Sequence, residues 1–408
     1  MFMAPTWKAA RRQEQVIKGI DAGLFATSIH RVLYGRPITQ KPESGAELAR
    51  DRLRWSLRAN YDDVPEGCVW VVDEASMVGW KLAEDIRTVA KMRGVAILWV
   101  GDGAQLPPVN EGAGVNLSMA TAALTEVHRQ KGDSPILDLA TWVREGGALS
   151  RWRWDATKKA ELWYSTVELG GVVPAMVKRL GEDWNPEEPS VDFISLTYRN
   201  ADRRYINAAV QKALVEAGRI KKASKVQGEP VINVGDRVVG TGNGAVMNGD
   251  LCRVVAVRPV SSGNLDGDVE LMPEELWAYH KNTSLSYVRV KVVGPCGEAV
   301  LTLPGVAEVG DKGDATYAAA YYTPRKLEKD EKKGLPKSVV LDSPLELGYC
   351  LTVHKAQGSG ARSVFVLLNP DSTPDEYEYP KWLYTAVTRA ERELKLVVVP
   401  GLPSGPRE

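Results

Sequence analysis

The sequence predicts an α/β fold with two parallel-sheet domains and a small β-barrel inserted in the second. Residues 1–129 alternate short β-branched runs with amphipathic helical stretches, which is the βαβ pattern of a mostly parallel sheet. The same alternation returns in residues 130–230 and again in residues 344–408. Between these two parts, residues 231–343 carry Gly-rich turns between short strands, as in a small β-barrel. We therefore expect a first domain over 1–129, a second over 130–230 and 344–408, and an inserted β domain over 231–343.

In the first domain, an apolar run rich in Val predicts a buried strand over Val69–Val72. A connecting helix is expected over Gly79–Arg93, followed by a second buried strand over Val95–Val100. Residues 34–67 interrupt this pattern with prolines around a charged run, so we expect a surface insertion with a helix over Ala46–Ala59.

The remaining elements follow from period and turn residues. Expected strands are Val191–Thr197, Arg237–Gly240, Cys252–Val257, Tyr287–Val293 and Val364–Leu368, with a helix over Ala201–Ala217 and a helix followed by a strand over Lys381–Val399. The densely charged segment Arg325–Lys337 is expected to be a solvated excursion.

Composition limits the class of protein. Lysine plus arginine and aspartate plus glutamate each total 52 among 408 residues, although the first 60 residues hold eleven basic against five acidic side chains. The four cysteines have no paired spacing, which argues against a zinc site and a disulfide framework. Because no apolar stretch reaches the roughly 20 residues of a membrane helix, we expect a cytoplasmic protein without membrane contact.

Two adjacent carboxylates, Asp73 and Glu74, end the apolar strand Val69–Val72. At the carboxyl edge of a parallel sheet, this pair predicts nucleotide hydrolysis, with Asp73 as the Mg²⁺ ligand and Glu74 orienting the attacking water. The alternative is structural, because Asp73 or Ser76 could cap the helix that follows.

A second block, Gly-Asp-Gly-Ala-Gln-Leu-Pro-Pro over Gly101–Pro108, follows the next expected strand. It would present Gln105 beside the same phosphates. A plain type I turn with Pro would require only part of this block, which favours the functional interpretation.

Together these two blocks resemble motifs II and III of superfamily-one helicases, specifically the RecD-like and Dda-like 5′→3′ branch. Further segments are similar to the family's other motifs, in order along nearly the whole chain. They are Met3–Ala10 (motif Ia), Ala26–Arg31 (the following Thr-Ile-His block), Leu124–Gln130 (motif IV), Tyr349–Gly358 (motif V) and Leu383–Ala390 (motif VI).

The resemblance implies two RecA-like domains of the P-loop NTPase type, with an SH3-like module as the β insertion. It assigns Arg129 and Arg389 to the nucleotide, where an always-ionised guanidinium neutralises phosphate charge. It also assigns Gln357 and Gly358 to the same cleft. For Arg389 the alternative is an ordinary ion pair with Glu391 or Glu393.

For DNA, the family's strand-binding positions supply hydroxyls, lysines and imidazoles. They correspond here to Pro5, Thr6, Lys8 and His30 in the first domain and to Thr352, His354 and Lys355 in the second. Each of these alone could equally be an ordinary capping or core-edge group. The implied partners are single-stranded DNA and duplex junctions, and residues 34–67 occupy the position of the family's duplex-splitting pin.

Few of the twelve tryptophans are candidates for stacking on DNA bases. Trp70 and Trp99 lie inside apolar strands and are expected in the core, whereas Trp7 is the one to test for base stacking. Two positions depart from the family pattern, namely Trp7, where Gly is usual, and Gly360, where an acid is common.

The phosphate-binding loop G-x-x-x-x-G-K-[ST] is missing, and no Gly-Lys dipeptide occurs in the 408 residues. In the family this loop precedes motif Ia, so we expect an incomplete chain, with an exposed apolar seam and unpaired backbone groups beside the Val69–Val72 strand. A separately encoded loop segment is one expected partner.

The sequence thus predicts the bulk of an ATP- and Mg²⁺-dependent 5′→3′ DNA helicase or single-strand translocase whose hydrolysis needs the missing loop. A different class stays open, a non-hydrolysing single-strand-binding or accessory protein derived from such a helicase. A third possibility is a RecA-like ATPase that acts on something other than nucleic acid.

Overall fold

The structure is a computed structural model, and it describes most of the chain. The described residues are 1–124 except 22, 35–37, 40–52, 55, 63, 65 and 110; 134–182 except 159; 192–259 except 221–224, 227–228 and 243–244; 286–309 except 296; 315–320; and 345–402.

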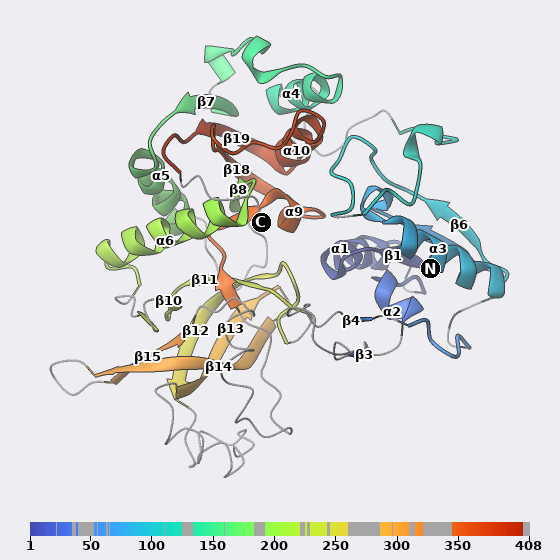
Figure 1. Cartoon of the computed structure of the whole chain (residues 1–408), viewed down its shortest axis with the longest axis horizontal. Helices are drawn as coiled ribbons and strands as arrows, with labels where there is room; N and C mark the ends of the chain where they lie inside the picture. The colour runs from blue at the N-terminus through green and yellow to red at the C-terminus, as the bar shows by residue number, and fades with distance from the viewer. Residues whose placement is uncertain are drawn as a thin grey trace, which may run out of the picture. The chain divides into compact units, whose positions relative to one another are not determined.

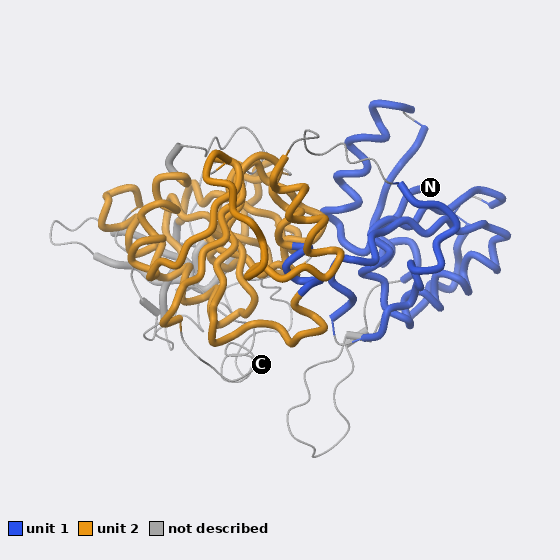
Figure 2. Tube along the Cα trace, turned by 90° about the horizontal axis from the view of Figure 1, so that it is seen from above, with its two compact units in different colours: residues 1–128, 380–385 blue, residues 129–379, 386–408 orange. Residues whose placement is uncertain are grey.

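The chain forms two compact units (Figure 2). The first comprises Met1–His128 together with Pro380–Thr385, and the second comprises Arg129–Tyr379 and Ala386–Glu408. Each has its own hydrophobic core, centred on Trp70 and Ile86 in the first unit and on Val210 and Phe365 in the second.

The first unit is built on a four-stranded parallel sheet in the order β2-β1-β5-β6. Figure 1 labels β1 and β6 of this sheet. Its strands are β1 (Phe2–Ala4), β2 (Ala26–Ser28), β5 (Val69–Val72) and β6 (Ala96–Trp99). The helices are α1 (Trp7–Lys18), α2 (Ile29–Leu33) and α3 (Trp80–Met92), with 3₁₀ turns η1 (Ala75–Met77) and η2 (Leu117–Met119). The predicted strand Val69–Val72 and its connecting helix are therefore confirmed, and the strand expected over Val95–Val100 is one residue shorter at each end. The prediction that this second strand is buried is wrong, because all four of its residues are exposed or half-buried at the end of the described sheet.

The prediction of an exposed apolar seam with unpaired backbone groups beside Val69–Val72 is wrong. Strand β5 pairs with β1 on one side and with β6 on the other, so its backbone is fully laddered. The open position belongs to β6, which within the described residues pairs only with β5. Leu98 and Val100 at this edge are 52% and 38% exposed. The expectation failed because it placed the strand of the phosphate-binding loop beside β5, whereas β1 and β6 occupy both of those positions.

Trp70 is fully buried, as predicted, but Trp99 is only half-buried. Its ring lies beside the Arg87 guanidinium, with the Cζ atom 5.5 Å from the ring centroid. Trp99 is the last residue of an edge strand, so one side of its ring is covered by Arg87 and not by the core.

The insertion within residues 34–67 was also expected to contain a helix over Ala46–Ala59. Residues 40–52 lie outside the described part, but Leu53–Arg54 form strand β4, which pairs antiparallel with β3 (Ile38–Thr39). The helix is therefore wrong over those two residues. Alternation of charged and apolar types along Arg52, Leu53, Arg54 and Trp55 has the period of a strand.

The second unit contains a five-stranded parallel sheet in the order β17-β8-β18-β19-β7. The strands are β7 (Leu162–Thr166), β8 (Phe193–Thr197), β17 (Cys350–Thr352), β18 (Ala361–Leu368) and β19 (Ala390–Val398). The helices are α4 (Pro135–Arg144), α5 (Leu169–Glu182), α6 (Asn200–Glu216), α9 (Val353–Ala356) and α10 (Glu378–Val387), with 3₁₀ turns η3 (Leu149–Arg151) and η4 (Ala156–Lys158). Helices α5 and α6 pack together against β8, and α4 packs against β19 (Figure 1). Parallel sheets with packed helices in both units confirm the α/β, RecA-like fold.

An eight-stranded antiparallel sheet, in the order β16-β11-β12-β13-β14-β15-β10-β9, belongs to the same unit. Its strands are β9 (Lys225–Val226), β10 (Glu229–Ile232), β11 (Arg237–Gly240), β12 (Leu251–Pro259), β13 (Ser286–Gly294), β14 (Gly297–Val309), β15 (Ala315–Ala320) and β16 (Leu345–Leu347). The predicted strands of this region are confirmed, whereas the SH3-like identity stays a prediction. The charged segment 325–337 lies outside the described residues.

Within the described part of the chain, none of the helices is both long and apolar enough to cross a bilayer.

Candidate nucleotide and nucleic-acid site

Asp73 lies at the carboxyl end of β5, in the centre of the first sheet. Its Oδ2 accepts a hydrogen bond of 2.7 Å from Gln13 Nε2, and its Oδ1 accepts one of 2.8 Å from the Glu74 backbone N–H. Both contacts use the carboxylate as an acceptor, which holds it at the sheet edge. Gln13 was not anticipated from sequence, because it lies on α1, sixty residues away along the chain.

Glu74 adopts a left-handed backbone conformation, with φ 51° and ψ 40°, directly before η1. It has the single positive φ among the described non-glycine residues. For such a residue this conformation costs roughly 1–3 kcal/mol and is concentrated at functional sites. The strain marks Glu74 as a residue whose position is imposed by its surroundings.

The helix-capping alternative for this pair does not describe the structure. The N-cap of α3 is Gly79, and no side chain caps that helix. Ser76 Oγ is buried and has no hydrogen-bond partner among the described residues.

Gly101 begins the second block, where the ends of β5 and β6 meet through the Ala75 N–H donating to the Val100 carbonyl at 2.9 Å. A Cβ at Gly101 would lie 2.9 Å from the backbone nitrogen of Ala75, so only glycine fits without displacing that backbone. Asp102 Oδ1 accepts from the Ala104 N–H, and Gln105 Oε1 is buried without a donor among the described residues. The block therefore presents an unsatisfied amide oxygen on the same unit as Asp73 and Glu74.

Residues of α10 that group with the first unit also contact this block. Tyr384 donates a hydrogen bond of 2.7 Å to Asp102 Oδ2, and the Leu106 N–H donates one of 2.9 Å to Thr385 Oγ1. Both partners belong to the motif VI segment, so motifs III and VI are in direct contact. Sequence reasoning singled out neither residue, since nearly 280 positions separate the partners and no local pattern signals the pairing.

The donor set fits Mg²⁺ as it binds in phosphoryl-transfer sites, through one or two carboxylates plus substrate phosphates. Asp73 supplies such a carboxylate. No cluster of three or more His, Cys, Asp or Glu side chains that could cage a metal occurs in the described residues. A metal at Asp73 would therefore take its remaining ligands from nucleotide phosphates and water.

The candidate DNA residues of the first unit lie around the start of α1 and α2. Thr6 is the N-cap of α1, and its Oγ1 accepts from the Ala9 N–H at 3.2 Å. Pro5 and Lys8 flank it and are partly exposed. His30 lies 5.4 Å from the Tyr34 ring, and burial lowers the pKa of its imidazole, so it is neutral at pH 7. Trp7 is half-buried, and its Nε1 has no acceptor in the described structure.

Thr352 repeats this arrangement in the second unit. It is the N-cap of α9, and its Oγ1 accepts from the Lys355 N–H at 3.3 Å. His354 Nε2 is 3.8 Å from Glu378 Oε1, and burial lowers the pKa of His354 while the Glu378 charge opposes that effect. Both threonines therefore act as ordinary helix caps, and Thr6 is partly exposed whereas Thr352 is buried.

Lys355 forms an ion pair with Glu346. Its Nζ is 2.9 Å from Glu346 Oε2, and the same oxygen lies 2.8 Å from Arg203 Nη1. Burial would raise the pKa of Glu346, but the two cations outweigh it and lower that pKa. Burial lowers the pKa of Lys355 and the like charge of Arg203 adds to that effect, while the Glu346 carboxylate opposes it. Neither Glu346 nor Arg203 was anticipated from sequence.

Arg389 is 2% exposed, and its guanidinium donates to the Ser359 carbonyl and to Thr388 Oγ1, each at 3.0 Å. Glu393, one of the two alternative ion-pair partners expected for Arg389, forms ion pairs with Arg179 and Lys395. Gln357 is buried at the end of α9, and Gly358 follows with φ 73°. Arg129 lies outside the described residues.

Gly360, the position where an acid is common, faces another carboxylate. A Cβ there would lie 3.1 Å from Glu391 Oε1. An acidic side chain would therefore meet a like charge in this protein.

Two protein families match the chain. Residues 1–159 match the AAA domain family, and residues 347–397 match the UvrD-like helicase C-terminal domain family. With the parallel sheets and the carboxylate pair, these matches support the resemblance to superfamily-one helicases.

Among curated relatives, the conjugal transfer protein TraA of Agrobacterium fabrum is 24% identical over 365 residues, covering 87% of this chain and 26% of TraA. The ATP-dependent RecD2 DNA helicase of Deinococcus radiodurans is 35% identical over 150 residues, covering 36% of this chain and 18% of RecD2. The chain thus spans about a quarter or less of the length of these relatives. Among solved structures, a Bacteroides Pif1 helicase in complex with ADP-AlF3 and single-stranded DNA is 17% identical, with a TM-score of 0.44 and coverage of 100% of this chain and 84% of that one.

Proposed function

We propose that this protein is the motor portion of an ATP-dependent DNA helicase or single-strand DNA translocase that moves 5′→3′. The observation that carries the proposal is the carboxylate pair at the end of β5, with Asp73 held by Gln13 and Glu74 held in a strained backbone conformation. The match to the AAA domain family over the same residues supports it, as does the similarity to the RecD2 helicase.

In the proposed reaction, each residue has a separate task. Asp73 would hold Mg²⁺, and the metal would supply neutralisation of phosphate charge. Glu74 orients the attacking water and accepts its proton, and the Gln105 amide oxygen, which has no donor among the described residues, accepts a hydrogen bond from the same water. Arg389 and Arg129 neutralise charge that develops on the transferred phosphoryl group, with Gln357 and Gly358 beside the nucleotide.

The proposed DNA path uses Pro5, Thr6, Lys8 and His30 in the first unit and Thr352, His354 and Lys355 in the second. The Thr6-capped start of the twelve-residue helix α1 supports it, because unpaired N–H groups at such a helix start attract a phosphate. Neutral imidazoles at His30 and His354 suit contact with sugars or bases better than charge neutralisation. Two sets of contacts on separate units allow ATP binding and release to move one set relative to the other.

ATP turnover also requires a phosphate-binding loop, and the 408 residues contain no Gly-Lys dipeptide. We propose that such a loop is supplied by a further segment whose strand pairs with the open edge of β6. The terminal place of β6 in the described sheet supports this placement, and the exposed Leu98 and Val100 show that one face at this strand is open to a covering segment. In this proposal the chain has three domains. The first motor domain spans 1–129, the second spans 130–230 and 344–408, and the inserted β domain spans 231–343.

The missing loop equally favours a second candidate, a single-strand-binding accessory protein that does not hydrolyse ATP. ATPase activity stimulated by single-stranded DNA separates the two. We expect turnover that falls at least 100-fold in Glu74→Gln and is unchanged in Glu84→Gln, an exposed carboxylate on α3 of the same unit.

The measurement is made on the purified chain, alone and with an added peptide that carries an apolar strand followed by the loop sequence. Turnover that needs the peptide and Glu74 supports the proposal. Strand binding by fluorescence anisotropy with no turnover in either condition would support the accessory protein, and absence of strand binding would contradict both.

A further inference from the structure

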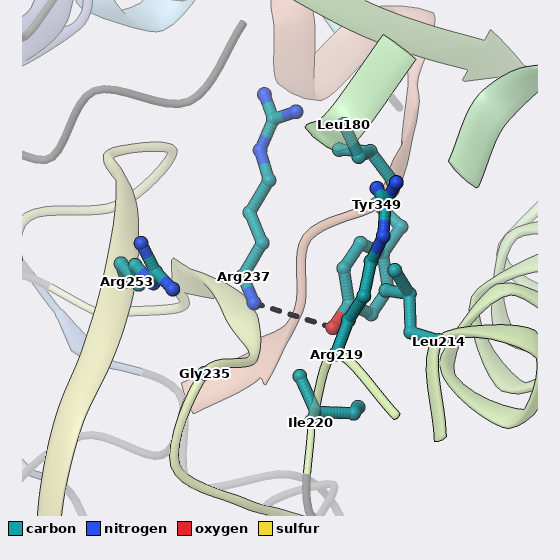
Figure 3. A pocket seen from close by; sticks show the side chains of 8 residues that line it. All are labelled: Leu180, Leu214, Arg219, Ile220, Gly235, Arg237, Arg253 and Tyr349. Carbon is teal, nitrogen blue, oxygen red and sulfur yellow. Dashed lines mark hydrogen bonds between the residues drawn. The ribbon is translucent and has the colours of Figure 1, made fainter. Parts of the chain in front are cut away.

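The second unit contains a pocket of about 400 Å³, lined in part by three arginines (Figure 3). The guanidinium groups of Arg219, Arg237 and Arg253 point in different directions, so they offer no common position for an anion. Two polar side chains that are in direct contact lie instead in the first unit, where helix α1 meets the end of β5.

Helix α1 carries a glutamine on the face that it buries. The apolar residues of this face are Ala9, Ala10 and Ile17. Gln13 comes four positions after Ala9 and four before Ile17, so it lies on the same stripe of the helix. This stripe faces the sheet, because α1 packs against β1 and β2. A polar amide among apolar neighbours is costly unless it forms hydrogen bonds.

Strand β1 brings the buried face of α1 close to the carboxyl end of β5. The two strands pair in parallel, with Met3 opposite Val72, and the Asp73 N–H donates to the Met3 carbonyl at 2.9 Å. Gln13 Nε2 then donates to Asp73 Oδ2 at 2.7 Å. Because an ionised carboxylate only accepts hydrogen bonds, this contact fixes which end of the Gln13 amide faces Asp73.

The other end of the amide, Gln13 Oε1, is buried and has no donor among the described residues. Most buried acceptors in proteins are satisfied by the chain itself, by water or by a ligand. Since Oε1 and Nε2 belong to one amide group, the unsatisfied acceptor lies directly beside the contact with Asp73. A donor that satisfies Gln13 Oε1 would therefore lie next to the proposed metal ligand.

The Asp73 carboxylate keeps capacity for a cation. A carboxylate has about four lone-pair sites, and Asp73 uses one on each oxygen, for Gln13 Nε2 and for the Glu74 N–H. Because the two donors bind different oxygens, the carboxylate cannot rotate without breaking one of these hydrogen bonds. Gln13 thus restricts the orientation of the group that would hold the metal.

We propose that Gln13 is a positioning residue for a divalent cation at Asp73. Its Nε2 holds the carboxylate in one orientation, and its Oε1 accepts a hydrogen bond from the water shell of the cation. Mg²⁺ keeps several waters when it binds through one or two carboxylates. Groups that orient a metal ligand in this way contribute about 10–100-fold to metal affinity. This inference rests on the proposed function, because it takes Asp73 as the metal ligand.

Binding of Mn²⁺, which favours the same oxygen ligands as Mg²⁺, tests this role without ATP turnover. Free Mn²⁺ is measured by electron paramagnetic resonance. Asp73→Asn defines the part of the binding that belongs to Asp73. Gln13→Met, which keeps an unbranched side chain of similar length, should weaken that part at least tenfold. The matched control is Gln15→Met, which changes an exposed glutamine on the same helix and should bind Mn²⁺ as the original chain does.

Thermal unfolding without metal separates positioning from a structural role. Gln13→Met and Gln15→Met should have similar Tm values, because glutamine and methionine have similar helix propensities. Gln13→Asn is the second variant. It keeps an amide but shortens the side chain by one methylene, so it should lose the contact with Asp73 and also weaken Mn²⁺ binding.

The outcomes distinguish this inference from the proposed function. Mn²⁺ binding that depends on Asp73 but is unchanged in both Gln13 variants overturns the positioning role and leaves the proposed function standing. A lower Tm in Gln13→Met without weaker binding does the same and assigns Gln13 a structural role. Binding that is absent, or that persists in Asp73→Asn, contradicts the metal assignment on which both proposals rest.

Discussion

Gly101 allows the turn after β6 to approach the turn after β5. We expect Gly101→Ala to lower the free energy of unfolding by about 1–3 kcal/mol, because the added Cβ would lie 2.9 Å from the Ala75 nitrogen and force backbone movement. Urea unfolding measures the change. The control is Gly103→Ala in the same turn, where the Cβ would meet its nearest neighbour, Leu117 Cβ, at an ordinary 3.5 Å. Equal effects of the two substitutions would contradict the close approach.

Asp236 is a second position where one residue dominates its surroundings. Burial raises its pKa to about 6, although the hydrogen bonds from Asn233, Tyr349 and Gln211 oppose that rise. The folded state therefore binds a proton more tightly than the unfolded state, whose aspartate pKa is about 3.9. The resulting stabilisation is complete below the unfolded pKa and is lost as the pH rises through about 6.

Between pH 5 and pH 8, the original chain should lose about 1 kcal/mol of stability relative to Asp236→Asn, which has no proton to lose. The two free energies of unfolding are compared at each pH, so that contributions from other groups cancel. Asp138→Asn, an exposed carboxylate on α4, should show no such pH-dependent difference. A difference of the opposite sign would mean that the hydrogen bonds outweigh the desolvation.

At the scale of elements, one carboxylate links three of them. Glu346 on β16 contacts Arg203 on α6 and Lys355 on α9, and all three groups are largely buried. Glu346→Gln should destabilise the second unit by about 3–5 kcal/mol, since it leaves two cations facing each other away from water. The exposed pair of Lys212 and Glu216 on α6 provides the control, and Glu216→Gln should change stability by less than about 1 kcal/mol. Both changes are read from urea unfolding, and a loss below about 1 kcal/mol for Glu346→Gln would show that the triad adds little.

Elements with a strong period were predictable. Val69–Val72 and Phe193–Thr197 are apolar, β-branched runs bounded by polar residues, and both form the central strands that their pattern indicates. The structure of the insertion was not predictable, because Leu53–Arg54 lie in a charged run whose composition favours a helix. These two residues form a strand because they pair with Ile38–Thr39. The order of the strands in the sheet could not be predicted from hydrophobic periodicity either. The unpaired edge was therefore expected at β5, whereas the described sheet ends at β6.

At the scale of the whole molecule, the two units carry separate cores and should unfold in separate steps. Hydrogen exchange with mass spectrometry, across a urea series, should show Gly101→Ala advancing the opening of residues in the first unit alone. Glu346→Gln should advance the second unit alone. If either substitution shifts both units by the same amount of denaturant, the molecule unfolds as one cooperative body.

The candidate site was predictable only as a set of motif positions. Asp73, Glu74 and Gln105 could be named because they follow apolar strands in recognisable blocks, yet Gln13 and Tyr384 complete their surroundings from other parts of the chain. Lys355 could be named as a basic residue in a helicase-like motif, but its pairing with Glu346 depends on strand β16, which no local pattern connects to it. Residue type and strand position are local, whereas hydrogen-bond partners are set by the fold.

The backbone of Glu74 has one more consequence, for evolution under relaxed selection. Glycine adopts φ 51° without the steric conflict that a side chain brings, so Glu74→Gly would release stored strain while removing the proposed base. A lineage that no longer needs hydrolysis would gain thermal tolerance by that single change, and a lineage that needs it would keep the strained acid. On the proposed function, the residue found at position 74 in natural variants would therefore record whether hydrolysis is under selection.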